Sequence, residues 1–342
     1  QTFPVTLHAA GTGVTGDQLI PNTNLDFGQV ELGASKTDTI TIDNTSGSGP
    51  LTVSALTVTG ADFTLSNNSC GNSYPQTVLT GSQCAVTIRF APGALNARSG
   101  LFTMDSDGAT APDSVNLLGS GVEPPAPVPN PTSLNFGDVV SGTSSTQTVT
   151  VTNKGTLSSL TLGQLSAGGD FSLQSDTCSG ATIAVGGNCT VVVEFTPGAV
   201  GGASETLDIP GASGFPSASV ALSGTGLQPA SLTANPTILA FGTQTQLATL
   251  DVTITNIGAA GQDAQIGTAG VTGTLTPQQF GIDADSCSGT TLASQATCQI
   301  SVTFDPDVEG VDTGSLDIPY NSGQTLPVAL SGRGGDPVDY IT

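Results

Sequence analysis

Six cysteines are the residues of this sequence best suited to forming bonds, and they occur as three closely spaced pairs. The pairs are Cys70 with Cys84, Cys178 with Cys189, and Cys287 with Cys298. An even count with regular spacing predicts three disulfides, and therefore an oxidising compartment. Each disulfide that closes such a short loop should add about 3 kcal/mol to the free energy of unfolding in the chain-entropy model. Zinc ligation is the alternative, but it favours closer cysteines with histidine partners, and the sequence has one histidine, His8.

Nucleophilic catalysis has little support in this sequence. Because His8 is the only histidine, no Ser-His or Cys-His pair can form within any of the three repeats described below. Every cysteine is accounted for by pairing. No acidic pair recurs in one register across the repeats, which disfavours a carboxylate-pair hydrolase as well. We therefore predict that the protein is not an enzyme.

Two acidic stretches are candidates for binding calcium, which takes about six to eight oxygen ligands. The first contains Asp105, Asp107 and Asp113, and the second contains Asp305, Asp307, Glu309 and Asp312. Neither matches the full calcium loop with its terminal bidentate glutamate, so solvated turn carboxylates are the alternative. Structural calcium is thus a weak candidate, and no other cofactor is expected. Asn44 and Asn67 also begin glycosylation sequons on expected turns.

The cysteine pairs belong to a longer segment that occurs three times, at residues 62–92, 170–197 and 279–306. Each copy has a phenylalanine near its start, two cysteines, and an alternating stretch that ends in Phe-x-Pro. The first cysteines of successive copies lie 108 and 109 residues apart. A period of this length is typical of tandem domains rather than of a solenoid. We predict three domains, each long enough to bury its own core.

Closing motifs rich in glycine set the expected boundaries. We expect domains at 15–122, 130–227 and 228–335, a proline-rich linker at 123–129, and a C-terminal tail at 336–342. The linker should be extended and semi-rigid because proline restricts its backbone. The tail repeats the Gly-to-Pro spacing found after the first two domains, so we interpret it as the start of another linker.

Composition and periodicity predict β-structure. The chain has 45 Gly, 21 Pro and only 9% charged residues, which disfavours surface helices. Residues 146–152 alternate polar and apolar side chains, and short stretches of this kind are separated by turn signals, as in an antiparallel β-sandwich. Cys189 shares its parity with the apolar residues that follow it, so its side chain should point toward the core and staple its edge.

Four motifs recur along the chain, although the first domain departs from them at its entry, Pro21-Asn22-Thr23-Asn24-Leu25, and in its longer cysteine loop. In the second domain they are Asn-Pro-x-x-Leu-x-Phe-Gly at 130–137, Thr-Val-Thr-Val-Thr-Asn-x-Gly at 148–155, the cysteine segment at 170–197, and Leu-Ser-Gly-x-Gly at 222–226. At these residues the chain resembles immunoglobulin-like domains of the abnormal-spindle/Hydin type, and more closely the secreted bacterial and archaeal repeats described as choice-of-anchor D proteins. The resemblance implies an all-β protein of three tandem immunoglobulin-like antiparallel β-sandwich domains, to which comparison of the domain ends adds an extra N-terminal strand. Such modules serve as spacers, adhesin parts or assembly subunits.

The net charge of −22, with only five basic residues, disfavours nucleic acid and anionic membranes as partners. This acidic charge favours solubility, and binding of cations is the more specific alternative. No apolar stretch is long enough to cross a bilayer, and no signal peptide is visible. We expect a mature or trimmed secreted chain at the cell surface or outside the cell, without membrane insertion.

Residues 1–14 repeat the closing strand of each domain but follow no domain of their own. Phe3, Val5 and Leu7 would form the apolar face of this strand, and Tyr340 and Ile341 lie in the tail. We predict that the strand adds to another copy of the chain, giving a filament or pilus-like fibre linked head to tail. The strand could instead fold back onto the first domain, or remain from a longer array.

The alternative function is a monomeric cell-surface stalk or adhesin module that presents a binding face. The expected partner is the protein itself in the first case, and other cell-surface proteins or glycans in the second.

Overall fold

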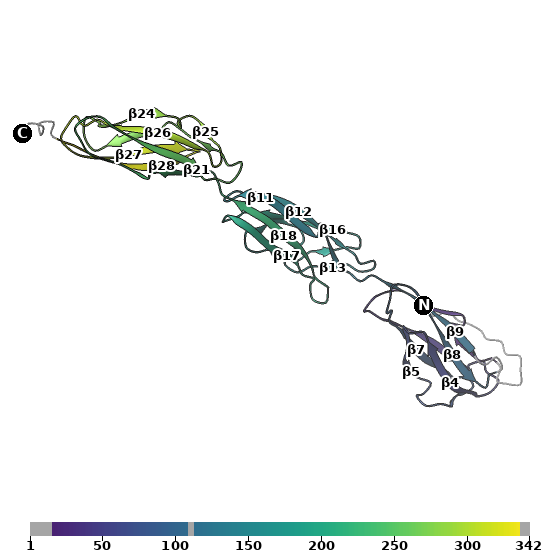
Figure 1. The fold of residues 1–342 in the computed structure, drawn as a ribbon. Coiled ribbons are helices and arrows are strands. Elements are labelled where there is room, and N and C mark those ends of the chain that lie inside the picture. Colours follow the sequence, from purple (N-terminus) through teal and green to yellow (C-terminus); the bar gives the residue numbers. More distant parts are fainter. Residues whose placement is uncertain (1–15, 109–112, 336–342) are drawn as a thin grey trace, which may run out of the picture.

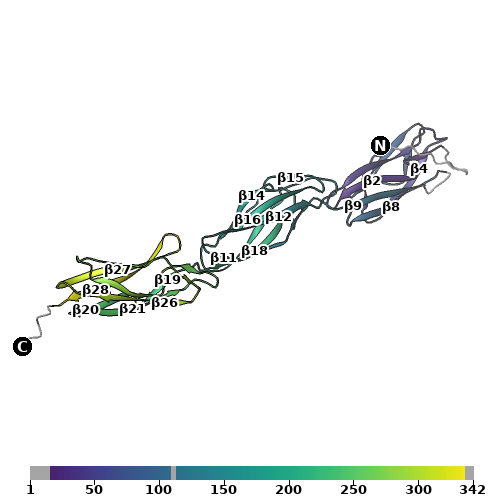
Figure 2. The same ribbon diagram turned by 90° about the horizontal axis from the view of Figure 1, so that it is seen from above.

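The computed structural model describes residues 16–108 and 113–335, which form three units arranged one after another in an extended row (Figures 1 and 2). The first unit contains β1 (Gln18–Ile20), β2 (Asn24–Glu31), β3 (Lys36–Asp43), β4 (Leu51–Thr59), β5 (Phe63–Asn68), β6 (Gln76–Val78), β7 (Gln83–Phe90), β8 (Asn96–Ser106) and β9 (Asp113–Val122). The second contains β10 (Pro127–Asn130), β11 (Ser133–Val140), β12 (Ser145–Asn153), β13 (Leu160–Thr161), β14 (Phe171–Asp176), β15 (Thr182–Ile183), β16 (Asn188–Phe195), β17 (Gly201–Ile209) and β18 (Ala218–Leu227). The third contains β19 (Leu232–Asn235), β20 (Ile238–Gln244), β21 (Ala248–Asn256), β22 (Ala264–Gln265), β23 (Gly270–Gly273), β24 (Phe280–Asp285), β25 (Thr291–Leu292), β26 (Thr297–Phe304), β27 (Gly310–Tyr320) and β28 (Gln324–Gly334).

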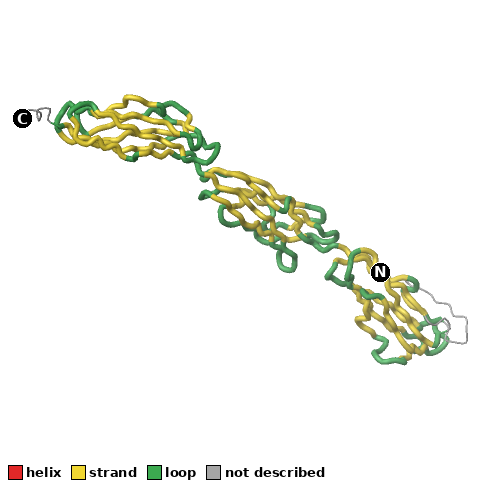
Figure 3. The backbone as a smooth tube through the Cα atoms, viewed as in Figure 1, coloured by secondary structure: helices red, strands yellow, loops and turns green. Residues whose placement is uncertain are grey.

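Each unit is a sandwich of two main sheets, as the strand pattern predicts. One sheet has the order β1-β3-β7-β5 in the first unit, β10-β12-β16-β14 in the second and β19-β21-β26-β24 in the third. The facing sheets are β2-β9-β8-β4-β6, β11-β18-β17 and β20-β28-β27-β23. Figure 3 shows strands and loops throughout the described residues, and none of these segments is a helix that could span a bilayer. The all-β sandwich prediction is confirmed.

One strand pair in each unit is parallel, which the antiparallel prediction did not include. These pairs are β2 with β9, β11 with β18, and β20 with β28. The opening segment of each unit is divided between the sheets: β10 pairs with β12, and β11 then crosses to lie beside the closing strand β18. Since β11 and β18 run the same way through the sandwich, the pair that they form is parallel.

Part of the predicted linker is a strand. Residues 127–129 fall within the linker expected at 123–129, yet they form β10 and pair antiparallel with β12. Pro127 and Pro129 are buried while Val128 is exposed, which is the alternation of a strand with one face on a core. Because β10 is an edge strand, prolines without an N–H group are tolerated there. Proline content alone therefore overestimated the linker.

Three phenylalanine rings fill the centre of each core. In the second unit the ring centroids of Phe171 and Phe195 are 4.7 Å apart, and both lie 5.7 Å from that of Phe136. Phe195 packs on Gly224 of the closing strand, where an added Cβ would come within 2.5 Å of the ring. Phe90 with Gly119 and Phe304 with Gly332 repeat this contact. The repeated Gly of the closing motif is thus the surface on which the ring lies.

A buried asparagine closes the end of each sandwich. In the second unit the Asn153 side chain donates to the carbonyls of Ser158 and Ile183, both at 3.1 Å, and accepts from the Gly155 N–H at 2.8 Å. Asn256 makes equivalent contacts in the third unit, and Asn44 in the first is fully buried. The Asn44 sequon is therefore inaccessible to a glycan in the folded protein.

The ring-on-glycine contact predicts a large effect for Gly224→Val. The valine Cβ would overlap the Phe195 ring, and overpacking of this kind costs about 1–3 kcal/mol of unfolding free energy. The matched control is Gly202→Val in the neighbouring strand β17, where an added Cβ meets no atom within 4 Å. Chemical denaturation of both variants measures the difference, and equal stabilities would contradict the packing argument.

Candidate functional site

All three predicted disulfides are present. The Cα atoms of Cys70 and Cys84 lie 5.1 Å apart, those of Cys178 and Cys189 5.2 Å, and those of Cys287 and Cys298 5.3 Å. Each bond joins a loop to the central strand of a sheet, namely β7, β16 or β26. Cys178 and Cys287 are fully buried. The cysteines therefore staple the edge of each core, and no described cysteine is a free thiol.

The acidic residues of the third unit are not brought together as a calcium site. Asp305, Asp307 and Glu309 are exposed in the loop between β26 and β27. Asp312 is fully buried, and its Oδ1 accepts hydrogen bonds from the backbone of Thr274 and Leu275 and from the Thr274 hydroxyl. Asp312 thus fixes the loop before β24, which is a structural role.

The acidic residues of the first unit separate differently. Asp105 is exposed on β8 and lies opposite Ala55 of β4. Asp107 and Asp113 lie near Asp17, a buried carboxylate just before β1 that the motif comparison did not single out. Burial raises the pKa of Asp17, and the charges of Asp113 and Asp107 raise it further, against a hydrogen bond from the Asp17 backbone. Within 16–108 and 113–335, no three acidic, histidine or cysteine side chains are already gathered as a metal centre.

The joints between the units are held by backbone hydrogen bonds. At the first joint, the N–H groups of Lys154 and Thr156 donate to the carbonyls of Ala126 (2.9 Å) and Glu123 (3.4 Å). The Lys154 ammonium also lies 3.1 Å from the Glu123 carboxylate. Gly155 lets the linker approach, because a Cβ there would lie 2.8 Å from the Cα of Pro125.

The second joint repeats this arrangement with different residues. The N–H of Ile257 donates to the Ser231 carbonyl at 2.8 Å, and that of Ala259 donates to the Gln228 carbonyl at 3.0 Å. A Cβ on Gly258 would lie 2.8 Å from the Cα of Ala230. Each linker is therefore bound to the unit that follows it.

A pocket of about 380 Å³ lies at the first joint. Residues 214–216, in the loop between β17 and β18, line it from the second unit, and residues 31–34 line it from the first. Pro124 and Pro125 of the linker complete the lining. In the third unit the corresponding strands β27 and β28 are joined by a tight turn at 321–323, so this loop has no counterpart there.

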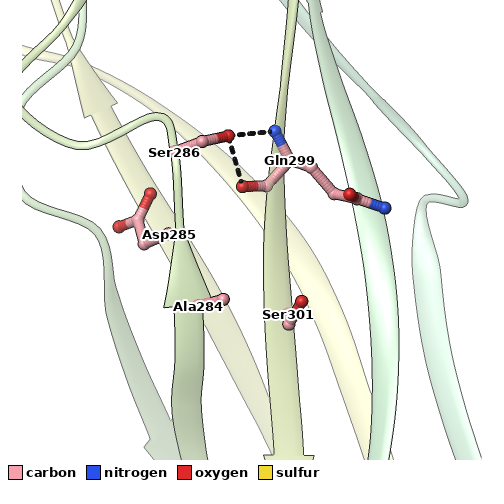
Figure 4. Close-up of a pocket in the computed structure, with 5 residues that line it drawn as sticks. All are labelled: Ala284, Asp285, Ser286, Gln299 and Ser301. Atoms are coloured by element: carbon pink, nitrogen blue, oxygen red, sulfur yellow. Dashed lines mark hydrogen bonds between the residues drawn. The ribbon is translucent and has the colours of Figure 1, made fainter.

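A second depression lies on the outer face of the third unit (Figure 4). The Ser286 hydroxyl donates to the Gln299 carbonyl at 2.9 Å and accepts from the Gln299 N–H at 2.8 Å. Burial raises the pKa of Asp285, but hydrogen bonds from the Ser288 hydroxyl and from the N–H groups of Ser288 and Cys287 outweigh it and hold this pKa low. The serine is committed to a backbone contact and the carboxylate to a turn, so the pair does not form a nucleophile and base.

The predicted assembly residues Phe3, Val5, Leu7, Tyr340 and Ile341 lie outside the residues that the structure describes. The described units do show what an added strand would meet. Each holds its own closing strand between two neighbours: β9 between β2 and β8, β18 between β11 and β17, and β28 between β20 and β27. In these three units the closing-strand position is filled.

The family model for the HYDIN/CFA65/VesB-like Ig-like domain matches residues 19–119 and 129–225, which is more than half of the chain. The chain belongs to this family. The resemblance to Hydin-type immunoglobulin-like domains, seen first in the repeated motifs, is thereby confirmed. No curated protein matches the sequence.

Several solved structures are similar to this HYDIN/CFA65/VesB-like chain at low identity. The I-band fragment I67–I69 of titin is 11% identical, with 96% of this chain and 100% of that chain covered and a TM-score of 0.30. Mouse clustered PcdhgC3 EC1-3 is 11% identical, with coverages of 84% and 89% and a TM-score of 0.36. The ASH/PapD-like domain 7 of human CEP192 is 15% identical, with coverages of 29% and 84% and a TM-score of 0.24.

The close approach at the first joint predicts the effect of Gly155→Val. The new side chain would displace Pro125 and break the contacts between the linker and the 154–156 loop, while both sandwiches stay folded. Small-angle X-ray scattering should then show a broader distribution of distances between the first two units. Gly168→Val is the control, because an added Cβ there meets no atom within 4 Å. An unchanged distribution for Gly155→Val would show that the joint does not depend on this contact.

The raised pKa of Asp17 predicts a pH-dependent stability. A carboxyl group with a raised folded pKa stabilises the fold below its unfolded pKa of about 3.9 and loses that contribution as pH rises through the folded value. In calcium-free buffer, Asp17→Asn should therefore raise the unfolding temperature by a few degrees at neutral pH and have little effect at the acid end. Calorimetry across this range measures the difference, and a constant difference at all pH values would contradict the assignment.

Proposed function

We propose that this chain is a non-enzymatic structural subunit of an extracellular filament or pilus-like fibre, assembled head to tail by addition of a terminal β-strand. The observation that carries the proposal is the row of three sandwiches with each linker hydrogen-bonded into the following unit (Figure 1). A row joined in this way resists rotation at the joints more than one with loose linkers. It suits a protein that spans distance or bears tension.

The disulfides support an extracellular location for this structural role. One bond per unit closes a short loop on the central strand, and such bonds persist in oxidising compartments. Few charged residues and a strongly acidic balance keep the surface soluble without favouring nucleic acid. We include in this proposal the closer resemblance to secreted choice-of-anchor D repeats.

Assembly would use the ends of the chain, with another copy of the protein as partner. Residues 1–14 have the sequence of a closing strand, with Phe3, Val5 and Leu7 on one face. Because the described units already contain their closing strands, the added strand would extend the edge of a sheet rather than fill a vacant position. Tyr340 and Ile341 would anchor the other end.

Removal of the terminal strand tests the proposal directly. Deletion of residues 1–14 should leave three folded units that no longer form fibres in electron micrographs. Val5→Asp should have the same effect because it places a charge on the apolar face of the strand. Thr6→Asp is the control, since neighbouring side chains of a strand point to opposite faces.

The same micrographs separate the two candidate roles. Fibres that persist after the deletion would overturn strand addition. Native material that consists of dispersed rods about three units long would instead favour the monomeric stalk or adhesin.

A further inference from the structure

The first unit carries carboxylates at two places where the other units have apolar side chains. The strand registers pair Leu19, Pro129 and Ala234 with the equivalent Ile42, Val151 and Ile254. Two residues before each of them stand Asp17, Pro127 and Leu232. In the closing strands, Asp113, Ala218 and Leu326 likewise precede the equivalent core residues Val115, Val220 and Val328 by two.

These substitutions place two carboxylates at one end of the first unit. Asp113 begins β9, whereas Val122 ends that strand at the joint with the second unit, so the acidic end is opposite the joint. Asp17 and Asp113 are each only 2% exposed. Burying a carboxylate is costly unless something compensates its charge, so the replacement of apolar residues by two of them indicates a specific use.

The Asp17 carboxylate has an unused oxygen close to a second oxygen donor. In the described residues its Oδ2 is buried and has no hydrogen-bond partner. Only a glycine at 108 allows this close approach, because an added Cβ would lie 2.6 Å from Asp17 Oδ2 and 3.1 Å from the Ser106 hydroxyl oxygen. The orphaned oxygen and the Ser106 hydroxyl therefore both lie beside the backbone of Gly108.

Further negative charge lies close to the Asp17 carboxylate. Asp107 and Asp113 both interact electrostatically with Asp17. The ion pairs that the described residues form are Arg98 with Asp62 and Lys154 with Glu123, so Asp17 takes part in neither. One oxygen of Asp107 accepts from the Thr52 N–H at 2.7 Å, and its side chain is exposed.

We propose that this end of the first unit binds one divalent cation of calcium's kind, with the Asp17 carboxylate as the central ligand. Asp107, Asp113 and the Ser106 hydroxyl supply further oxygens, and water completes the shell. Calcium suits the position better than magnesium because it accepts flexible, mixed oxygen ligands, whereas magnesium requires near-octahedral geometry. The site differs from the acidic stretch expected at Asp105, Asp107 and Asp113, since Asp17 replaces Asp105. It does not depend on strand addition.

Thermal unfolding of the full chain, freed of metal with EDTA, tests the site. Millimolar CaCl₂ should raise the temperature at which the first unit unfolds by roughly 2–8 °C, as expected for a ligand that binds only the folded state. NaCl at equal ionic strength should give a clearly smaller shift, since it only screens charge. MgCl₂ should also give less than CaCl₂.

Two variants distinguish calcium ligation by Asp17 from general screening of negative charge. Asp17→Asn should remove the calcium-dependent shift while the variant stays folded. Asp105→Asn, which changes the same charge at an exposed position of the same unit, should keep it. The proposal is overturned if wild-type protein shows no calcium-specific shift, or if Asp17→Asn retains the full shift. Isothermal titration that finds one calcium site lost in Asp17→Asn but kept in Asp105→Asn would confirm the stoichiometry.

Discussion

The hydrogen bonds of the buried asparagine connect the interior of each sandwich with its joint. The Asn153 side-chain amide donates hydrogen bonds to the carbonyls of Ser158 and Ile183, and its oxygen accepts one from the Gly155 N–H. Gly155 in turn is the residue against which Pro125 of the linker lies. Asn256, Gly258 and Ala230 repeat the arrangement at the second joint. The position of one unit relative to the next therefore depends on a side chain that is itself part of the core.

Much of the fold could be predicted because its determinants are local in sequence. Cysteine spacing, period-two alternation and glycine-containing turns identified the disulfides, the strands and the sandwich class. The parallel pairing of β11 with β18 could not be predicted in this way, because it depends on where the opening segment crosses between sheets. Residues 127–129 were assigned to the linker because proline content does not distinguish an edge strand from an extended tether.

The candidate cation site shows the same limit. A motif search emphasises neighbouring acidic residues, and it grouped Asp105 with Asp107 although Asp105 is exposed on β8. Asp17 lies far from them in the sequence, and the residues beside it in the sequence are not acidic. Its signal lies in the comparison between repeats, where it occupies the position of Pro127 and Leu232. That comparison requires the strand registers, which only the structure supplies.

The loop between β17 and β18 makes the two joints mechanically unequal. It lines a pocket at the first joint together with residues 31–34, while the tight turn at 321–323 leaves the third unit without a corresponding loop. Bending that closes this pocket would bring the loop against residues 31–34, so we expect most of the bending at the joint near residue 228. The rod would then have a stiff segment and a hinged segment. The third unit could change direction while the first two keep their alignment.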